Sequence, residues 1–224
     1  MEETSSRSVV KNASLEGKFI INDTPTYLLM KRAIDILASL TGIILLSPLF
    51  ALLAILIKLE DPKGKVFFQQ VRIGKDEKEF NMYKFRSMVS NAEELLNELL
   101  EKNEVSGAMF KIRKDPRITK IGKFIRKSSL DELPQLFNVL KGEMTLVGPR
   151  PPLPREVLKY TSYHKKRLLG KPGCTGVWQV SARNNVGFDE MIEMDIKYLS
   201  ERNVTSDLVI IFKTVIVMIC SRAY

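Results

Sequence analysis

The middle of the chain carries two adjacent carboxylates, Asp131 and Glu132, in a sequence that is otherwise strongly basic. The formal net charge of the 224 residues is +9. A carboxylate can attack phosphorus or hold a hard cation, and basic side chains beside it can neutralise phosphate oxygens. Basic residues flank the pair on both sides in sequence: Arg126, Lys127 and Arg150. The pattern predicts an enzyme that acts on a phosphorylated substrate.

Pro134 favours a helix that begins near Leu133, with the two carboxylates at its mouth. A capping box that starts at Ser129 is the alternative, but it would put Pro134 fifth in the helix, where its missing N–H is needed. At a helix mouth the free amides and the dipole favour negative charge. We therefore expect both carboxylates to keep low pKa values and stay ionised. A simpler alternative is that they only complement the charge of the helix N-terminus.

Further cationic and polar side chains are candidates for binding the substrate. Arg150 lies between Pro149 and Pro151, which hold the backbone so that its guanidinium is aimed before a phosphate arrives. Lys84 and Arg86 alternate along an expected strand and therefore share one face. The remaining candidates are Arg126, Gln179 and Arg183. For each of these residues, an ordinary solvated or core side chain is the alternative.

The rest of the composition narrows the chemistry. Cys174 and Cys220 lie far apart, and His164 is the only histidine. A disulfide scaffold, a zinc site and a histidine-based catalytic triad are therefore not expected. A metal, if one is used, would be a hard cation bound by carboxylate oxygen and phosphate. Nucleic acid is not expected as a partner, because basic and aromatic residues alternate only over the short segment 83–86.

Residues 36–57 form an apolar segment that carries no charge and is long enough to cross a membrane. Two features speak instead for a helix that enters, bends and returns. Pro48 interrupts the helical hydrogen bonds near the centre, and Ser47 can satisfy a freed carbonyl. Basic residues also flank both ends, which would put both ends on the cytoplasmic side: Lys31 and Arg32 before, and Lys58, Lys63 and Lys65 after. From these features alone, a re-entrant helix and a spanning helix are about equally favoured.

The elements expected around these residues describe an α+β chain that is mainly helical and has a small β-hairpin. We divide it into a mobile polar tail (residues 1–28), a membrane helix (29–60) and a catalytic domain with interfacial amphipathic helices (61–224). Alternating apolar residues predict the hairpin over 65–88 and a short strand over 144–147. Residues 170–185 are expected to be irregular. Helical patterns cover 90–102, 117–127, 133–141, 154–169, 189–201 and 207–220.

Several motifs occur in an order that resembles the bacterial sugar transferases, the monotopic phosphoglycosyl transferases. The resemblance runs from about Leu29 to Ile219 and centres on the long, specific block 129–142. The other matching motifs are Lys31-Arg32 with Asp35, Ser47-Pro48, and the segments 83–88, 148–151 and 171–176. Cys174 departs from the aliphatic residue that is usual at its position. The short N-terminal tail is similar to the minimal form of the family, since larger members carry several spanning helices before this region.

The resemblance implies transfer of a sugar 1-phosphate from a UDP-sugar to undecaprenyl phosphate, with release of UMP. Asp131 would carry the phosphosugar as a covalent intermediate, and Glu132 would bind Mg²⁺ with it or assist proton transfer. Arg126 and Arg150 match family arginines near the phosphates. The segment 178–184 is more similar to members that use UDP-hexoses such as UDP-galactose or UDP-glucose.

The resemblance also implies a re-entrant membrane helix broken at Ser47-Pro48, in the bacterial inner membrane, with the catalytic domain on the cytoplasmic face. The product would enter exopolysaccharide or glycoconjugate assembly. Whether the chain forms a homo-oligomer is left open. Two rivals are a non-catalytic, membrane-attached binding module and a transferase that works in one step without a covalent intermediate.

Overall fold

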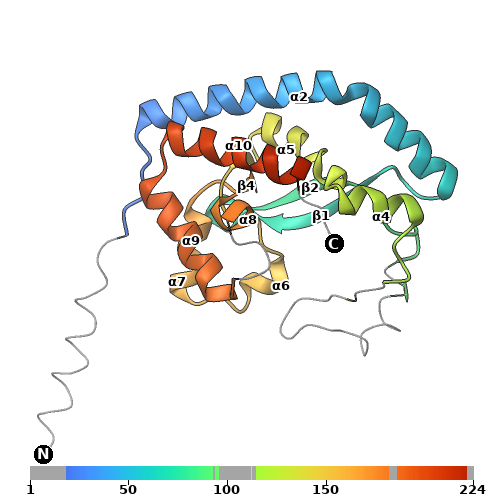
Figure 1. Ribbon diagram of the computed structural model, residues 1–224. Coiled ribbons are helices and arrows are strands. Elements are labelled where there is room, and N and C mark those ends of the chain that lie inside the picture. The colour runs from blue at the N-terminus through green and yellow to red at the C-terminus, as the bar shows by residue number, and fades with distance from the viewer. Residues whose placement is uncertain (1–18, 93, 96–111, 113–114, 182–185, 221–224) are drawn as a thin grey trace, which may run out of the picture.

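The computed structural model describes residues 19–92, 94, 95, 112, 115–181 and 186–220. A long helix, α2 (Pro25–Glu60), lies along one side of a domain of short helices and strands (Figure 1). Helices α10 (Val204–Cys220) and α5 (Gln135–Lys141) lie beneath it in that view, and α4 (Lys120–Lys127) lies under its C-terminal end. The expected class, mainly helical α+β, is confirmed.

Helix α2 has a bend where a break between two helices was expected. It begins at Pro25, ahead of the expected start at Leu29, and continues through Pro48. The hydroxyl of Ser47 donates a hydrogen bond to the carbonyl oxygen of Ile44 at 2.8 Å. This carbonyl is the one that the missing N–H of Pro48 leaves without its helical partner. Ser47 thus satisfies a freed carbonyl, as predicted, and the helix curves in its second half instead of breaking (Figure 1).

One face of α2 packs on the domain, and its opposite face is apolar and exposed. The buried residues recur mostly every fourth position: Tyr27, Lys31, Asp35, Ser39, Leu53 and Ile57. Large exposed side chains, such as those of Leu29, Leu37, Leu45 and Leu59, cover the rest. Near one end, Lys31 pairs with Asp207 on α10 at 2.7 Å. At the other end, Glu60 accepts a hydrogen bond from the backbone N–H of Lys120 at 2.6 Å. Both ends of α2 therefore rest on the same domain.

The described part of the expected mobile tail, residues 19–28, is docked on the domain. Phe19 and Ile21 pack against a buried cluster of Val147, Tyr198, Leu199 and Ile210. The backbone N–H of Asn22 donates to the carbonyl of Leu199 at 3.0 Å. Apolar residues at alternate positions make this docking possible, and α2 begins at Pro25, within the stretch assigned to the tail. Residues 1–18 lie outside the described part of the chain.

Two small sheets hold the middle of the domain together. Strands β1 (Phe67–Ile73) and β2 (Glu79–Phe85) form the predicted antiparallel hairpin, joined by the turn η1 (Lys75–Glu77). The short strand β3 (Thr145–Val147) is also confirmed. It pairs in parallel with β4 (Gly173–Thr175), which lies in the segment expected to be irregular. Val139 of α5 packs with Met82 and Met144 in a buried cluster, which joins α5 to the hairpin.

The other helices follow the predicted order with different bounds. Helix α4 starts after Thr119, whose hydroxyl accepts a hydrogen bond from the N–H of Gly122 at 2.8 Å. The helix expected over 154–169 is three short pieces, because Thr161 caps a new helix start by accepting from the N–H of His164. These pieces are α6 (Pro154–Val157), α7 (Ser162–Lys165) and η4 (Lys166–Leu169).

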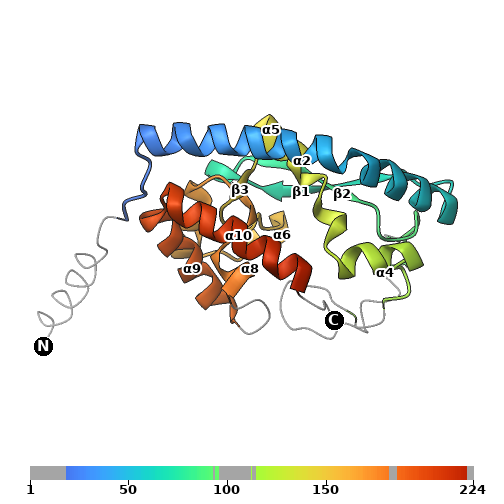
Figure 2. The same cartoon turned by 45° about the horizontal axis from the view of Figure 1, so that its top comes forward.

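The C-terminal part completes the fold. A short helix, α8 (Val177–Ser181), follows β4, and α9 (Phe188–Glu201) and α10 match the two predicted helices. Figure 2 shows α10 running from the side of α9 towards α4. The helix predicted over 90–102 lies mostly outside the described residues.

Candidate active site

The two carboxylates lie on a short turn between α4 and α5. Asp131 and Glu132 belong to η3 (Leu130–Glu132), a single 3₁₀ turn. Ser129 precedes it with a φ of 57°, a left-handed conformation that redirects the chain after α4. Ser129 makes no side-chain capping bond, so the capping box is not formed. Helix α5 begins at Gln135, and the carboxylates therefore precede its first turn instead of belonging to it.

Glu132 is held by two cations from different elements. The Nζ of Lys84 on β2 donates a hydrogen bond to Oε1 of Glu132 at 2.7 Å. A guanidinium nitrogen of Arg150 lies 3.9 Å from the same oxygen. Burial opposes the charge of Glu132, but the attraction of Lys84 and Arg150 outweighs it and lowers the pKa to about 2. Glu132 is therefore ionised at any physiological pH, as expected from the sequence.

Asp131 behaves in the opposite way. Burial raises its pKa to about 6, and the negative charge of Glu132 adds to this effect, while Lys84 and Arg126 oppose it. Among the described residues, no basic side chain forms an ion pair with Asp131, because Lys84 is taken by Glu132. The expectation of a low pKa for Asp131 is therefore wrong. Desolvation exceeds the stabilisation expected from a helix mouth, since the carboxylate precedes α5.

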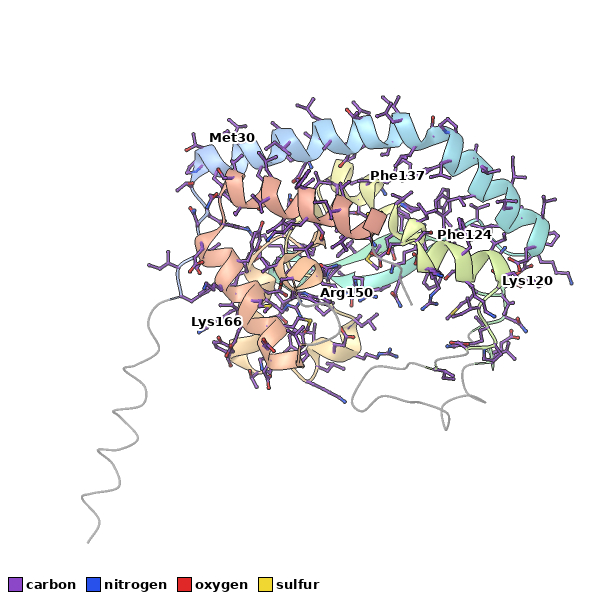
Figure 3. The ribbon with its side chains drawn as sticks, viewed as in Figure 1. Met30, Lys120, Phe124, Phe137, Arg150 and Lys166 are labelled. Carbon is purple, nitrogen blue, oxygen red and sulfur yellow. The ribbon has the colours of Figure 1, made fainter. Side chains whose placement is uncertain are left out.

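The loop that carries Arg150 is held by hydrogen bonds to its backbone carbonyls. The carbonyl of Pro149 accepts a hydrogen bond from the N–H of Gly173 at 2.9 Å. The guanidinium of Arg167 donates to the carbonyl of Arg150 at 3.0 Å, and that of Arg72 donates to the carbonyl of Pro151 at 2.9 Å. The side chain of Arg150 remains 38% exposed. A rigid backbone with an accessible guanidinium suits the grip on phosphate that was predicted. Figure 3 shows Arg150 well away from α2.

Arg72 and Arg167 were not predicted from the sequence. Arg167 is almost fully buried and pairs with the equally buried Asp195 at 2.5 Å. Burial raises the pKa of Asp195 to about 6, against the attraction of Arg167. No local pattern marked these residues, because Arg167 lies in a segment that resembled one amphipathic helix and its partners are distant in sequence.

The remaining predicted site residues are not all brought together. Arg86 is not directed to the dyad: it donates to a carboxylate oxygen of Asp61 at 2.6 Å and ties the end of α2 to the hairpin. Lys84 and Arg86 therefore have separate tasks, and Arg86 lies one residue beyond the end of β2 at Phe85. Arg126 is exposed on the last turn of α4, near enough for its charge to act on Asp131. Arg183 lies outside the described residues.

A cavity of about 300 Å³ adjoins Glu132. It lies among η3, α5, β3, β4, α8 and α10. Gln135, Gln179 and the hydroxyl-bearing Thr175 and Thr214 supply polar groups beside Glu132. The apolar lining comes from Leu133, Leu136, Leu146, Val180, Ile211, Val215, Val217 and Met218. The cavity thus extends from Glu132 to the apolar helix α10, and Gln179, one of the predicted site residues, is part of its lining.

The two carboxylates fit a Mg²⁺ site whose other ligands are water and phosphate oxygens of the substrate. Within the described ranges, no group of three or more histidine, cysteine, aspartate or glutamate side chains converges on a metal position. Mg²⁺ commonly binds through one or two carboxylates together with water and substrate phosphate oxygens. Asp131 and Glu132 can provide the two carboxylates. They do not form a closed cage that would hold the ion without a phosphate.

The amino-acid sequence of this chain is similar to those of known sugar transferases. The family model described as bacterial sugar transferase matches residues 26–221. The galactosyl transferase CpsE of Streptococcus agalactiae serotype III is 46% identical over 87% of this chain and 43% of its own length. The undecaprenyl-phosphate galactose phosphotransferase of Salmonella typhimurium is 45% identical over 83% of this chain and 39% of its own length. The exopolysaccharide production protein ExoY of Rhizobium meliloti is 41% identical, over 86% of each chain. The chain therefore spans less than half of the first two relatives and most of the third.

Proposed function

Because the chain belongs to the bacterial sugar transferase family, we propose that it moves a hexose 1-phosphate, with galactose as the first choice of sugar, from a UDP-sugar to undecaprenyl phosphate. The preference for galactose rests on the names of two of the relatives. The product would be a lipid-linked sugar that begins exopolysaccharide or glycoconjugate assembly.

The observation that carries this proposal is the unequal environment of the two carboxylates. Glu132 is neutralised by Lys84 at 2.7 Å, whereas Asp131 has a raised pKa of about 6 and remains available for attack. A pair of titratable groups whose pKa values are pushed apart is typical of catalytic sites with divided roles. At pH 7 and above, Asp131 is mostly ionised and can act as a nucleophile.

The proposed reaction has two displacements. In the first, an oxygen of Asp131 bonds to the β-phosphorus of the UDP-sugar, the bond from that phosphorus to the bridging oxygen breaks, and UMP leaves with the bridging oxygen. In the second, a phosphate oxygen of undecaprenyl phosphate attacks the same phosphorus, and the carboxylate of Asp131 leaves. The net result is undecaprenyl diphosphate sugar, and Asp131 is regenerated as a carboxylate.

The cations around the dyad would lower the charge repulsion that opposes both attacks. Arg150 would bind the phosphates of the donor from its fixed loop, and Arg126 would approach them from α4. Mg²⁺, when bound to Asp131, Glu132 and the substrate, would supply further neutralisation of the phosphate oxygens. Glu132, already ionised and held by Lys84, would keep its position whether or not the metal is present.

The contacts of α2 support the membrane arrangement that we propose. At about 1.5 Å per residue its 36 residues extend about 54 Å, well beyond the roughly 30 Å hydrocarbon core. Both ends of α2 contact one folded domain, and a helix that crossed the bilayer would place its ends on opposite sides. These contacts support a helix that enters the membrane from one side by its exposed apolar face. We infer that this side is the cytoplasmic face of the bacterial inner membrane.

The cavity supports a ligand with two unlike ends. Its lining combines Glu132 and other polar side chains with apolar residues of α10, such as Val215 and Met218. An isoprenoid phosphate has this character, because its charged end must reach the phosphorus while its hydrocarbon chain remains away from water. The lipid would then arrive from the membrane side without leaving the bilayer completely.

The test uses detergent-purified protein, radiolabelled UDP-galactose and Mg²⁺, without any lipid acceptor. The proposal predicts release of about one UMP per protein and acid-labile label on the chain, and both are lost in Asp131→Asn. A one-step transferase would release UMP only when undecaprenyl phosphate is added. A binding module would release none with UDP-galactose, UDP-glucose or their N-acetylated analogues.

The topology is tested separately by cysteine accessibility in sealed inverted vesicles. Met30→Cys and Lys63→Cys, each in a background with both natural cysteines changed to serine, should react with a membrane-impermeant maleimide from the same, cytoplasmic side. Reaction from opposite sides would mean that α2 spans the membrane.

A further inference from the structure

The first part of α2 carries charged residues that have no role in the proposed reaction. Lys31 and Asp35 are 8% and 4% exposed, on a helix whose residues 36–57 carry no charge. Arg32 lies beside them and is partly buried. Placing charged groups in such surroundings costs free energy unless each is paired or hydrogen-bonded. Their contacts therefore indicate what this segment does.

Arg32 holds the C-terminal end of α5. Its two terminal nitrogens donate hydrogen bonds to the carbonyl of Val139 at 2.7 Å and the carbonyl of Leu140 at 2.8 Å. Carbonyls in the last turn of a helix lack helical partners, and a cation there is favourable. Gly142 ends α5 with a φ of 83°, and its backbone N–H also donates to the carbonyl of Val139 at 2.9 Å, so the guanidinium of Arg32 adds to this C-terminal cap. The turn η3, which carries Asp131 and Glu132, precedes the N-terminal end of α5. Because α5 has seven residues, only about 10 Å separate its two ends.

Lys31 and Asp35 hold strand β3 from the same side. The carboxylate of Asp35 accepts from the hydroxyl of Thr145 at 2.7 Å and from the N–H of Leu146 at 2.9 Å. The Nζ of Lys31 donates to the carbonyl of Val147 at 2.9 Å. Gly148, which follows Val147, begins the loop that carries Arg150. All three residues of β3 are thus bonded to two side chains of α2.

We propose that Lys31, Arg32 and Asp35 are positioning residues that set α5 and β3 relative to each other, and so set Arg150 against the dyad. This inference rests on the proposed function. The first part of α2 would be a clamp on the catalytic site as well as a membrane anchor. The guanidinium of Arg150 lies 3.9 Å from Glu132, at the outer limit of an ion pair. A small shift between the two elements would therefore change the grip on phosphate, and misplacement by about 1 Å can reduce a rate about 100-fold.

The experiment measures UMP release in detergent, without lipid acceptor, so that membrane insertion does not contribute. Arg32→Lys keeps the charge but cannot donate to both carbonyls in the same geometry. Asp35→Asn keeps the shape but loses one acceptor. Each is expected to lower the single-turnover rate constant for UMP release about 10-fold, with a change of less than about 3-fold in the UDP-galactose concentration that gives half of the maximal rate. The matched control is Leu37→Ala on the exposed face of α2, which should release UMP at the normal rate.

A double-mutant cycle separates positioning from general damage to the fold. If Asp35 acts through the loop of Arg150, Asp35→Asn should cost about 10-fold alone but less than about 2-fold when Arg150 is already alanine. Equal costs in both backgrounds would overturn the inference, as would a normal single-turnover rate constant in both Arg32→Lys and Asp35→Asn. Thermal unfolding of each variant shows whether it is folded at the assay temperature. Absence of UMP release by the unmodified chain would instead refute the proposed function.

Discussion

Removing the charge of Asp131 and of Glu132 should change the stability of the protein in opposite directions. The pKa of Asp131 is raised to about 6, roughly two pH units above that of an ordinary aspartate. Each unit corresponds to about 1.4 kcal/mol, so ionised Asp131 costs up to about 3 kcal/mol, or about 2 kcal/mol when solvent screening of this partly buried group is allowed for. Asp131→Asn removes the cost and should stabilise the fold.

Glu132 should show the reverse effect. Its pKa of about 2 lies roughly two units below the ordinary value, and its side chain is 29% exposed, so its ion pairs contribute about 1 to 2 kcal/mol. Glu132→Gln also leaves Lys84, which is 16% exposed, without its carboxylate. At pH 7.5 we expect the Tm to rise by about 3 to 6 °C in Asp131→Asn and to fall by a similar amount in Glu132→Gln.

The assay is thermal unfolding in detergent, followed by circular dichroism from pH 4.5 to 8. Because the pKa of Asp131 is raised in the folded state, the cost of its charge is full above pH 6 and fades as the pH falls towards 4. The advantage of Asp131→Asn should therefore fall to about half by pH 5. The contribution of Glu132 is present above pH 4 and is lost only as the pH falls towards 2, so Glu132→Gln stays less stable throughout. Tm shifts of the same sign in both variants at pH 7.5 would refute the reasoning.

Three further predictions follow from the same contacts. The rate of UMP release should fall about tenfold per pH unit below an apparent pKa near 6, because protonated Asp131 cannot attack, and a rate independent of pH between 5 and 7 would exclude it as the titrating nucleophile. Arg167→Lys keeps a charge beside Asp195 but loses the guanidinium that also donates to the carbonyl of Arg150. Steady-state kinetics should therefore show the KM for UDP-galactose raised about 10-fold. An unchanged KM would show that Arg167 does not position the loop of Arg150. Val215→Trp should fill the cavity beside α10, leaving the UMP burst intact and slowing transfer to added undecaprenyl phosphate, whereas loss of the burst would show that the donor occupies this space.

Local patterns were enough to predict the parts of the site that lie close together in sequence. The approximate bounds of α5 followed from Pro134 and Gly142, because the first cannot lie deep in a helix and the second readily adopts positive φ. The hydrogen bond from Ser47 to the carbonyl that Pro48 frees could be predicted because its acceptor, Ile44, is three residues away. The hairpin that carries Lys84 followed from alternation.

Pairings between distant residues could not be predicted in this way. Lys84 and Arg86 look equivalent in the sequence, but the first reaches Glu132 and the second reaches Asp61. The pKa of Asp131 depends on burial, which arises only when α4, β2 and α5 come together. The buried pair Arg167 and Asp195 lies 28 residues apart in sequence. In each case the deciding quantity is a three-dimensional distance or a loss of solvent.

The most direct test of the account is intact-protein and peptide mass spectrometry after incubation with UDP-galactose and Mg²⁺ in the absence of lipid. The account predicts that the chain gains the mass of one hexose phosphate less one water, that the modification lies on Asp131, and that undecaprenyl phosphate removes it. UMP release with an unmodified chain, or an adduct that persists in Asp131→Asn, would contradict the central claim.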